Sequence, residues 1–152
     1  MVFFMDEKLL LDSILECTNQ IISKYNSSSE IAKKIRTRAR SMPEYSFTRG
    51  LAYTIVFIAS KSSKDLVETG LTAQKCEDVI NKIKESKIGS EEEESYAIYG
   101  AVLLYIAKKL GIVKGNKFEG IVYDVMRSPV VEIKMWSVLD WLKRVTEAYI
   151  HE

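Results

Sequence analysis

Residues that carry most enzyme chemistry are scarce in this chain of 152 residues. Its one histidine, His151, is the next-to-last residue, and its two cysteines form no CxxC pair, so the usual zinc motifs are missing. The seven glycines are scattered, which leaves no phosphate loop of the Walker or Rossmann type. No serine lies in a GxSxG motif. We therefore expect a protein that is not an enzyme and that uses no cofactor and no metal.

Long apolar runs are also missing. The longest, residues 51–59, is far shorter than the roughly 20 residues that span a bilayer. Charged residues at positions 6–8 interrupt the N-terminal segment, which does not resemble a signal peptide. Cys17 and Cys76 each lie on an apolar helix pattern, so we expect buried free thiols in a reducing cytosol rather than a disulfide. The sequence thus predicts a soluble, cytoplasmic protein without a membrane partner.

Hydrophobic periodicity predicts an all-α fold, a single-domain bundle of six or seven helices over residues 1–152. Apolar residues recur every three or four positions, and no segment alternates like a strand. Pro43 is expected to end the second helix, because the residue before a proline avoids the helical region. The third helix is apolar nearly all round and is expected to be central and buried. The expected helices cover residues 3–25, 30–41, 46–61, 73–87, 94–110, 118–126 and 129–150.

The same periodicity assigns the aromatic side chains to faces. Phe3, Phe47 and Tyr149 fall on inward faces of their helices. Tyr96 belongs to a stripe on the fifth helix that is more typical of a core than of a base-stacking platform. Trp136 falls on the outer side of the last helix, where it is a candidate anchor for a protein partner.

Positive charge is concentrated in one segment. Residues 30–64 hold eight lysines and arginines against two glutamates, a net charge of +6, whereas the whole chain carries +1. On a helix, Lys33, Arg36 and Arg40 form one stripe, and Lys34 and Arg38 form a second stripe on the opposite flank. Such basic rims can hold phosphates without reading bases. The alternative interpretation is a solvated helix face with weak surface ion pairs.

Three segments resemble the small helical subunit of the type III-B CRISPR effector, the Cmr complex. The segment RSMPEYSFTRGLAYTIVFIASK matches that family's pattern at Arg40, Pro43, Gly50, Leu51, Thr54, Phe57 and Lys61. The segment VEIKMWSVLDWLKRVTEAYI carries its aliphatic-x-tryptophan-x-basic-basic core at Leu139, Trp141, Leu142, Lys143 and Arg144. The segment ESYAIYGAVLLYIAKKLGI is similar in position, length and character. Arg49 departs from the pattern, because the family commonly has asparagine there.

The resemblance implies a non-catalytic role in antiviral defence. Copies of such subunits stack in an inner filament beside other Cmr subunits, and their basic faces line the groove that holds guide RNA and target RNA. The expected RNA-binding residues are Arg40, Lys61, Lys143 and Arg144 from the matched positions, and Lys33, Arg36, Arg38 and Arg49 from the charge pattern. The expected partners are therefore other Cmr effector subunits, guide and target RNA, and copies of the chain itself.

Three other functions fit parts of the sequence. The chain could be a protein-protein adaptor without direct RNA contact, in which the arginines only keep the surface solvated. It could be the small subunit of a type III-A or archaeal type I effector, since these are also helical. A regulator that binds duplex DNA is the third alternative, although the sequence shows no helix-turn-helix with base-reading side chains.

Overall fold

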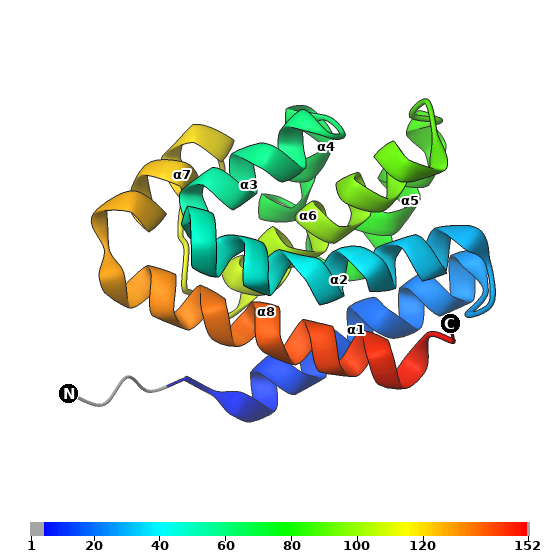
Figure 1. The fold of residues 1–152 in the computed structure, drawn as a ribbon, viewed down its shortest axis with the longest axis horizontal. Helices are drawn as coiled ribbons and strands as arrows, with labels where there is room; N and C mark the ends of the chain where they lie inside the picture. Colours follow the sequence, from blue (N-terminus) through cyan, green and yellow to red (C-terminus); the bar gives the residue numbers. More distant parts are fainter. Residues whose placement is uncertain (1–4, 152) are drawn as a thin grey trace.

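The computed structural model describes residues 5–151, and within that range it contains eight α-helices, one 3-10 helix and no strand (Figure 1). The all-α expectation is confirmed, but the number of helices exceeds the predicted six or seven. The helices are α1 (Glu7–Tyr25), α2 (Glu30–Arg49), α3 (Leu51–Ser60), α4 (Lys64–Glu68), η1 (Thr69–Leu71), α5 (Cys76–Ser86), α6 (Glu91–Lys109), α7 (Phe118–Arg127) and α8 (Pro129–Tyr149).

The additional helix, α4, lies in a stretch that the sequence assigned to a connection. Ser63 caps it, because its hydroxyl accepts a hydrogen bond from the Leu66 amide. Val67 is buried against α6 and holds the short helix in place. A helix of five residues is too short to show a hydrophobic period, so tertiary packing rather than pattern defines it.

The centre of the fold is α6, not α3 as the sequence predicted. Every side chain from Ser95 to Ala107 is buried, and α6 contacts α1, α2, α3, α4, α5, η1 and α8. In α3, by contrast, Tyr53 and Val56 are 48% and 45% exposed. A helix that is apolar on every side can be buried on every side, or it can keep one apolar side on the surface. The sequence does not distinguish these two arrangements, so the prediction for α3 failed.

The helix α2 continues through Pro43 and ends at Arg49, eight residues beyond the predicted end. Met42 and Ser46 are buried on either side of the proline, so packing against the core overrides the local preference. The Ser46 hydroxyl also donates to the Pro43 carbonyl at 2.8 Å. Gly50 has φ +92°, a backbone conformation that favours glycine, and this turn separates α2 from α3.

Cys17 of α1 and Cys76 of α5 form a disulfide, which corrects the prediction of free thiols. Their Cα atoms are 5.3 Å apart, and both residues are fully buried. They are 59 positions apart in sequence. Their pairing follows from the packing of α1 on α5, which spacing alone does not reveal.

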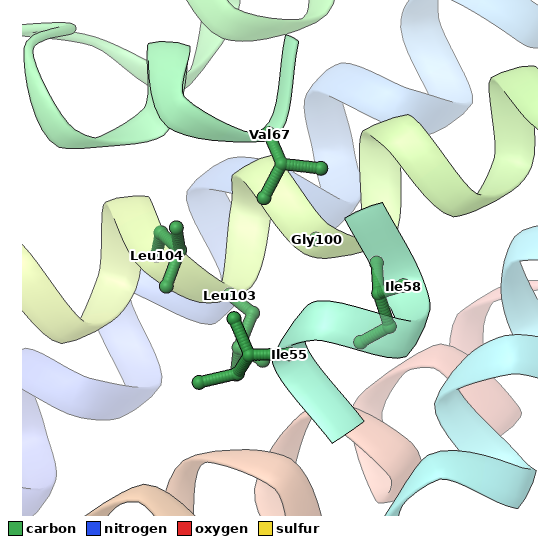
Figure 2. A pocket seen from close by; sticks show the side chains of 6 residues that line it. All are labelled: Ile55, Ile58, Val67, Gly100, Leu103 and Leu104. Carbon is green, nitrogen blue, oxygen red and sulfur yellow. The ribbon is translucent and has the colours of Figure 1, made fainter. Parts of the chain in front are cut away.

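Small residues let α6 approach its neighbours closely. A side chain at Gly100 would meet the methyl groups of Ile58 and Val67 at 2.7 and 3.0 Å, and a side chain at Gly70 would meet the Ala101 carbonyl oxygen at 2.1 Å. Figure 2 shows Ile55, Ile58, Val67, Leu103 and Leu104 around Gly100. The gap between them has no room for a water molecule. It is a packing contact of the core rather than a ligand site.

Four predicted positions of aromatic residues have mixed outcomes. Tyr96 is buried as expected. Phe47 and Tyr149 were predicted to face inward but are 78% and 43% exposed, because each lies near the end of its helix, where the core no longer covers that face. Trp136 was predicted to be exposed but is half-buried, with a buried indole nitrogen. Phe3 lies outside the described residues.

Candidate nucleic-acid interface

The two basic stripes of α2 lie beside different helices, so the predicted site residues divide between two surfaces. One flank of α2 packs along α8, and in Figure 1 α8 runs below α2, which crosses the middle of the view. The other flank faces α6 and α3. We call the first surface the α2–α8 rim, defined by Lys33, Arg36, Arg40, Lys143 and Arg144. The second is the aromatic row, defined by Tyr45, Arg49, Tyr53, Phe57 and Lys61.

Glu147 joins the two halves of the α2–α8 rim. Arg40 donates through Nε to a Glu147 carboxylate oxygen at 3.1 Å, and Arg144 donates to the other oxygen at 3.4 Å. The hydrogen bond from Arg40 holds the pKa of the Glu147 carboxyl below its ordinary value, and the charges of Arg144 and Lys143 act in the same direction. One carboxylate thus gathers three cations from segments about a hundred residues apart.

The remaining rim residues extend the surface along α2. Lys33 lies one turn before Arg36 and forms an ion pair with Glu30 at 3.9 Å. Arg36 is half-buried, and its Nε atom is covered by protein. The outer part of the rim is more open, because the Arg40 and Arg144 side chains are 44% and 69% exposed. The end of the rim around Glu147 is therefore the part most accessible to a phosphate.

Arg38, on the opposite flank, is held by α6. Its guanidinium lies 4.2 Å from the centre of the Tyr96 ring and 3.7 Å from the Glu92 carboxylate, and its Nε donates to the Ser95 hydroxyl at 3.4 Å. Only 15% of the side chain is exposed. The structure therefore gives Arg38 a structural role between helices, which the charge pattern could not separate from RNA binding.

Arg49 and Lys61 lie at the two ends of α3, each over an aromatic ring. The Arg49 guanidinium is 5.2 Å from the centre of the Tyr53 ring, and the Lys61 ammonium is 5.6 Å from the centre of the Phe57 ring. The sequence analysis treated both cations as isolated charges and missed their contacts with the rings of Tyr53 and Phe57. A signal was present, because three aromatic residues and two cations follow one another at intervals of four from position 45 to position 61.

An apolar hollow lies between the end of α2 and α8. It has a volume of about 170 Å³ and is lined by Pro43, Ser46, Phe47, Trp136 and Leu139. The Phe47 and Trp136 rings are 6.1 Å apart between centres. The Trp136 indole nitrogen is buried without a hydrogen-bond partner. An apolar surface with one unsatisfied donor suits a protein partner that supplies an apolar side chain and a carbonyl oxygen.

The described part of the chain contains no cluster of three or more histidine, cysteine and acidic side chains that could hold a metal ion. None of the helices in residues 5–151 combines the length and the apolar character needed to cross a membrane.

Comparisons with known proteins agree with the sequence resemblance. No model of a known protein family matches the chain. The CRISPR system CMR subunit Cmr5 of Saccharolobus solfataricus is 31% identical over 138 residues, which covers 83% of this chain and 85% of that protein. In structure, the chain is similar to a subunit of a type III-B Cmr-beta complex bound to non-cognate target RNA, with a TM-score of 0.66, 22% identity and 99% of both chains covered. The structural likeness shows a shared fold, and the sequence identity over most of both chains shows that this chain belongs to the Cmr5 family of small type III-B CRISPR subunits.

Proposed function

We propose that the chain is a non-catalytic subunit of an RNA-guided type III-B effector and that the α2–α8 rim contacts the backbone of guide or target RNA. The observation that carries this proposal is the convergence of Arg40, Lys143 and Arg144 around Glu147. The three cations come from the two segments that resemble the family most closely. Arginine side chains in a fixed fork suit phosphate oxygens, and Glu147 orients two of them before RNA arrives.

The rim is suited to positioning RNA rather than to reading its sequence. Guanidinium and ammonium groups contact phosphates, which carry no sequence information. The chain would then hold strands of any sequence, as a subunit of a guide-directed complex must. Copies of the chain stack side by side in this proposal, so that successive rims form a continuous basic track.

Contact with a protein partner is assigned to the hollow between Phe47 and Trp136. Phe47 is 78% exposed beside a buried indole donor that lacks a partner. Burying such a ring in an interface removes apolar area from water, and a partner carbonyl would satisfy the donor. This surface lies on the same flank of α2 as the rim, so one face of the molecule serves both contacts.

The test is a tagged pull-down from the native host, with proteins identified by mass spectrometry and RNA by sequencing. The wild-type chain should recover several effector subunits together with short guide RNAs. An Arg40→Glu/Arg144→Glu variant should fold and recover the protein subunits with less RNA crosslinked to the chain. A Phe47→Ser variant should lose protein partners instead. Recovery of one unrelated protein and no RNA by the wild-type chain would refute the assignment.

A further inference from the structure

The aromatic row turns back on itself at Gly50, which brings its rings together. Tyr45 lies near the end of α2, and Tyr53 and Phe57 lie on α3 beyond the glycine turn. The centre of the Tyr45 ring is 4.7 Å from that of Phe57 and 6.0 Å from that of Tyr53. The row extends inward through Phe57, which meets the buried Tyr96 edge-on at 6.0 Å. The exposed rings therefore pack, through Phe57, on a buried ring of the core.

Cations flank the rings of the row and leave about half of the Tyr53 side chain exposed. Tyr53 is 48% exposed, although Arg49 lies over its ring at 5.2 Å. Arg49 and Lys61 are both exposed, and within the described residues neither forms an ion pair with a carboxylate that would neutralise it. Flat aromatic surface and positive charge therefore meet in one place. Interaction with an aromatic ring also orients a cation, which reduces the cost of ordering it on binding.

A hollow beside Tyr45 adds depth to this surface. Its volume is about 290 Å³, and its lining residues are Ser41, Glu44, Tyr45 and Thr48, all from α2. Pockets that enclose small ligands measure roughly 300–1,000 Å³, so this smaller hollow can border a planar group but does not enclose one. Glu44 is its acidic residue and supplies carboxylate oxygens that can accept hydrogen bonds from an N–H group at the edge of a base. Partial burial and the neighbouring Tyr53 phenol raise the pKa of Tyr45, so its hydroxyl stays protonated.

We infer that the aromatic row binds an unpaired nucleobase of single-stranded RNA, which stacks on Tyr53 while Arg49 and Lys61 hold nearby phosphates. This inference rests on the proposed RNA contact and adds a second surface to it. Stacked rings between cations are the means by which proteins hold single strands without sequence preference. A duplex cannot present a base in this way, because its bases are already stacked. A protein anchor would use the rings but would leave the cations without an anionic partner.

The experiment compares two fluorescent RNA probes of equal length and charge, an oligouridylate and an abasic ribose-phosphate oligomer. The full chain should bind the oligouridylate about tenfold more tightly at low salt, since stacking of one base strengthens binding by about that factor. Tyr53→Leu should abolish the difference between the probes, and Tyr53→Phe should retain it, because phenylalanine keeps the aromatic face. Tyr123→Leu is the matched control. Tyr123 on α7 is 52% exposed with Arg127 at 5.0 Å from its ring, outside the aromatic row.

Two results separate this inference from the proposed function. Equal binding of both probes by the wild-type chain would overturn base stacking while leaving a phosphate-binding rim intact. An Arg40→Gln/Arg144→Gln variant should weaken binding of both probes alike and preserve their ratio. If that variant bound both probes as the wild-type chain does, phosphate binding by the α2–α8 rim would be refuted, whereas base stacking on Tyr53 would still stand. Binding of neither probe by the wild-type chain would refute both.

Discussion

Removing two cations from the α2–α8 rim should change how strongly salt weakens RNA binding. Arg40 and Arg144 both contact Glu147, and both are substantially exposed, so replacing them with glutamine leaves the core untouched. Each cation that neutralises a phosphate releases counterions, and log K for a single strand falls with log salt by about 0.7 for each contact. The Arg40→Gln/Arg144→Gln variant should therefore reduce the magnitude of the slope by about 1.4.

The size of this effect is large enough to measure. Between about 50 and 200 mM salt, a slope reduced by about 1.4 means that the variant loses about sevenfold less affinity than the wild-type chain. Fluorescence anisotropy with a single-stranded oligoribonucleotide across that salt range gives the slope directly. At the lowest salt, the variant should also bind more weakly.

A matched control is Lys64→Gln/Lys82→Gln, which removes the same net charge from α4 and α5, in the upper half of Figure 1. If the control reduced the slope as much as the rim variant, the effect would come from net charge alone. If neither variant changed the slope, the rim would not contact phosphates. Either result would refute the reasoning.

The contact between Arg40 and Glu147 allows a test without RNA. Because Arg40 stabilises the ionised Glu147, the pKa of Glu147 is lowered and should rise toward the ordinary value of 4.5 in Arg40→Gln. A carboxyl with a lowered pKa stabilises the folded state above its unfolded pKa and loses this effect as the pH falls through its folded pKa. The difference in stability between the two proteins should therefore shrink below about pH 4.5. Carboxyl chemical shifts from NMR would follow the titration, and an unchanged Glu147 pKa in the variant would contradict the ion pair.

Two further predictions concern the fold that carries these surfaces. Gly70→Ala should destabilise the protein by about 2–3 kcal/mol, because the new methyl group would collide with a main-chain carbonyl of α6. Gly120→Ala on α7 should be neutral or stabilising, because nothing lies within 4 Å of the added carbon. Thermal unfolding of both variants would check this, and equal melting temperatures would contradict the close approach. Reducing the disulfide between Cys17 and Cys76, which lie 59 positions apart, should remove about 4 kcal/mol of stability. Unfolding with and without reductant would measure the loss. Two free thiols in the denatured, unreduced protein would show that the bond does not form.

Local patterns predicted the helical segments correctly in most of the chain. Ser90 caps α6 just before four glutamates and accepts a hydrogen bond from the Glu93 amide at 3.1 Å. Ser128 caps α8, with Pro129 as the first helical residue. These signals are reliable because caps and hydrophobic periods depend on residues within one or two turns of each other. Pro43 misled the prediction because packing outweighed a local preference.

The charge pattern placed Lys33, Arg36 and Arg40 on one surface but could not assign each residue a role. Lys33, Arg36 and Arg40 do share one flank of α2, and this follows from helical geometry alone. That Arg38 would be held by α6, and that Glu147 would join Arg40 to Arg144, depend on contacts across 57 and 107 positions. No local pattern contains such contacts, because they arise only when helices pack.

The sequence by itself determined the helical class, most helix boundaries and the basic character of α2, since each depends on neighbouring residues in the chain. Its resemblance to known subunits also determined the family. Tertiary structure alone decided that α6 rather than α3 is central, that Cys17 meets Cys76, and that the rings of Tyr45, Tyr53 and Phe57 gather between cations. These outcomes depend on which apolar faces meet. Burying an apolar face gains about the same free energy whichever partner covers it, so the local sequence does not specify the partner.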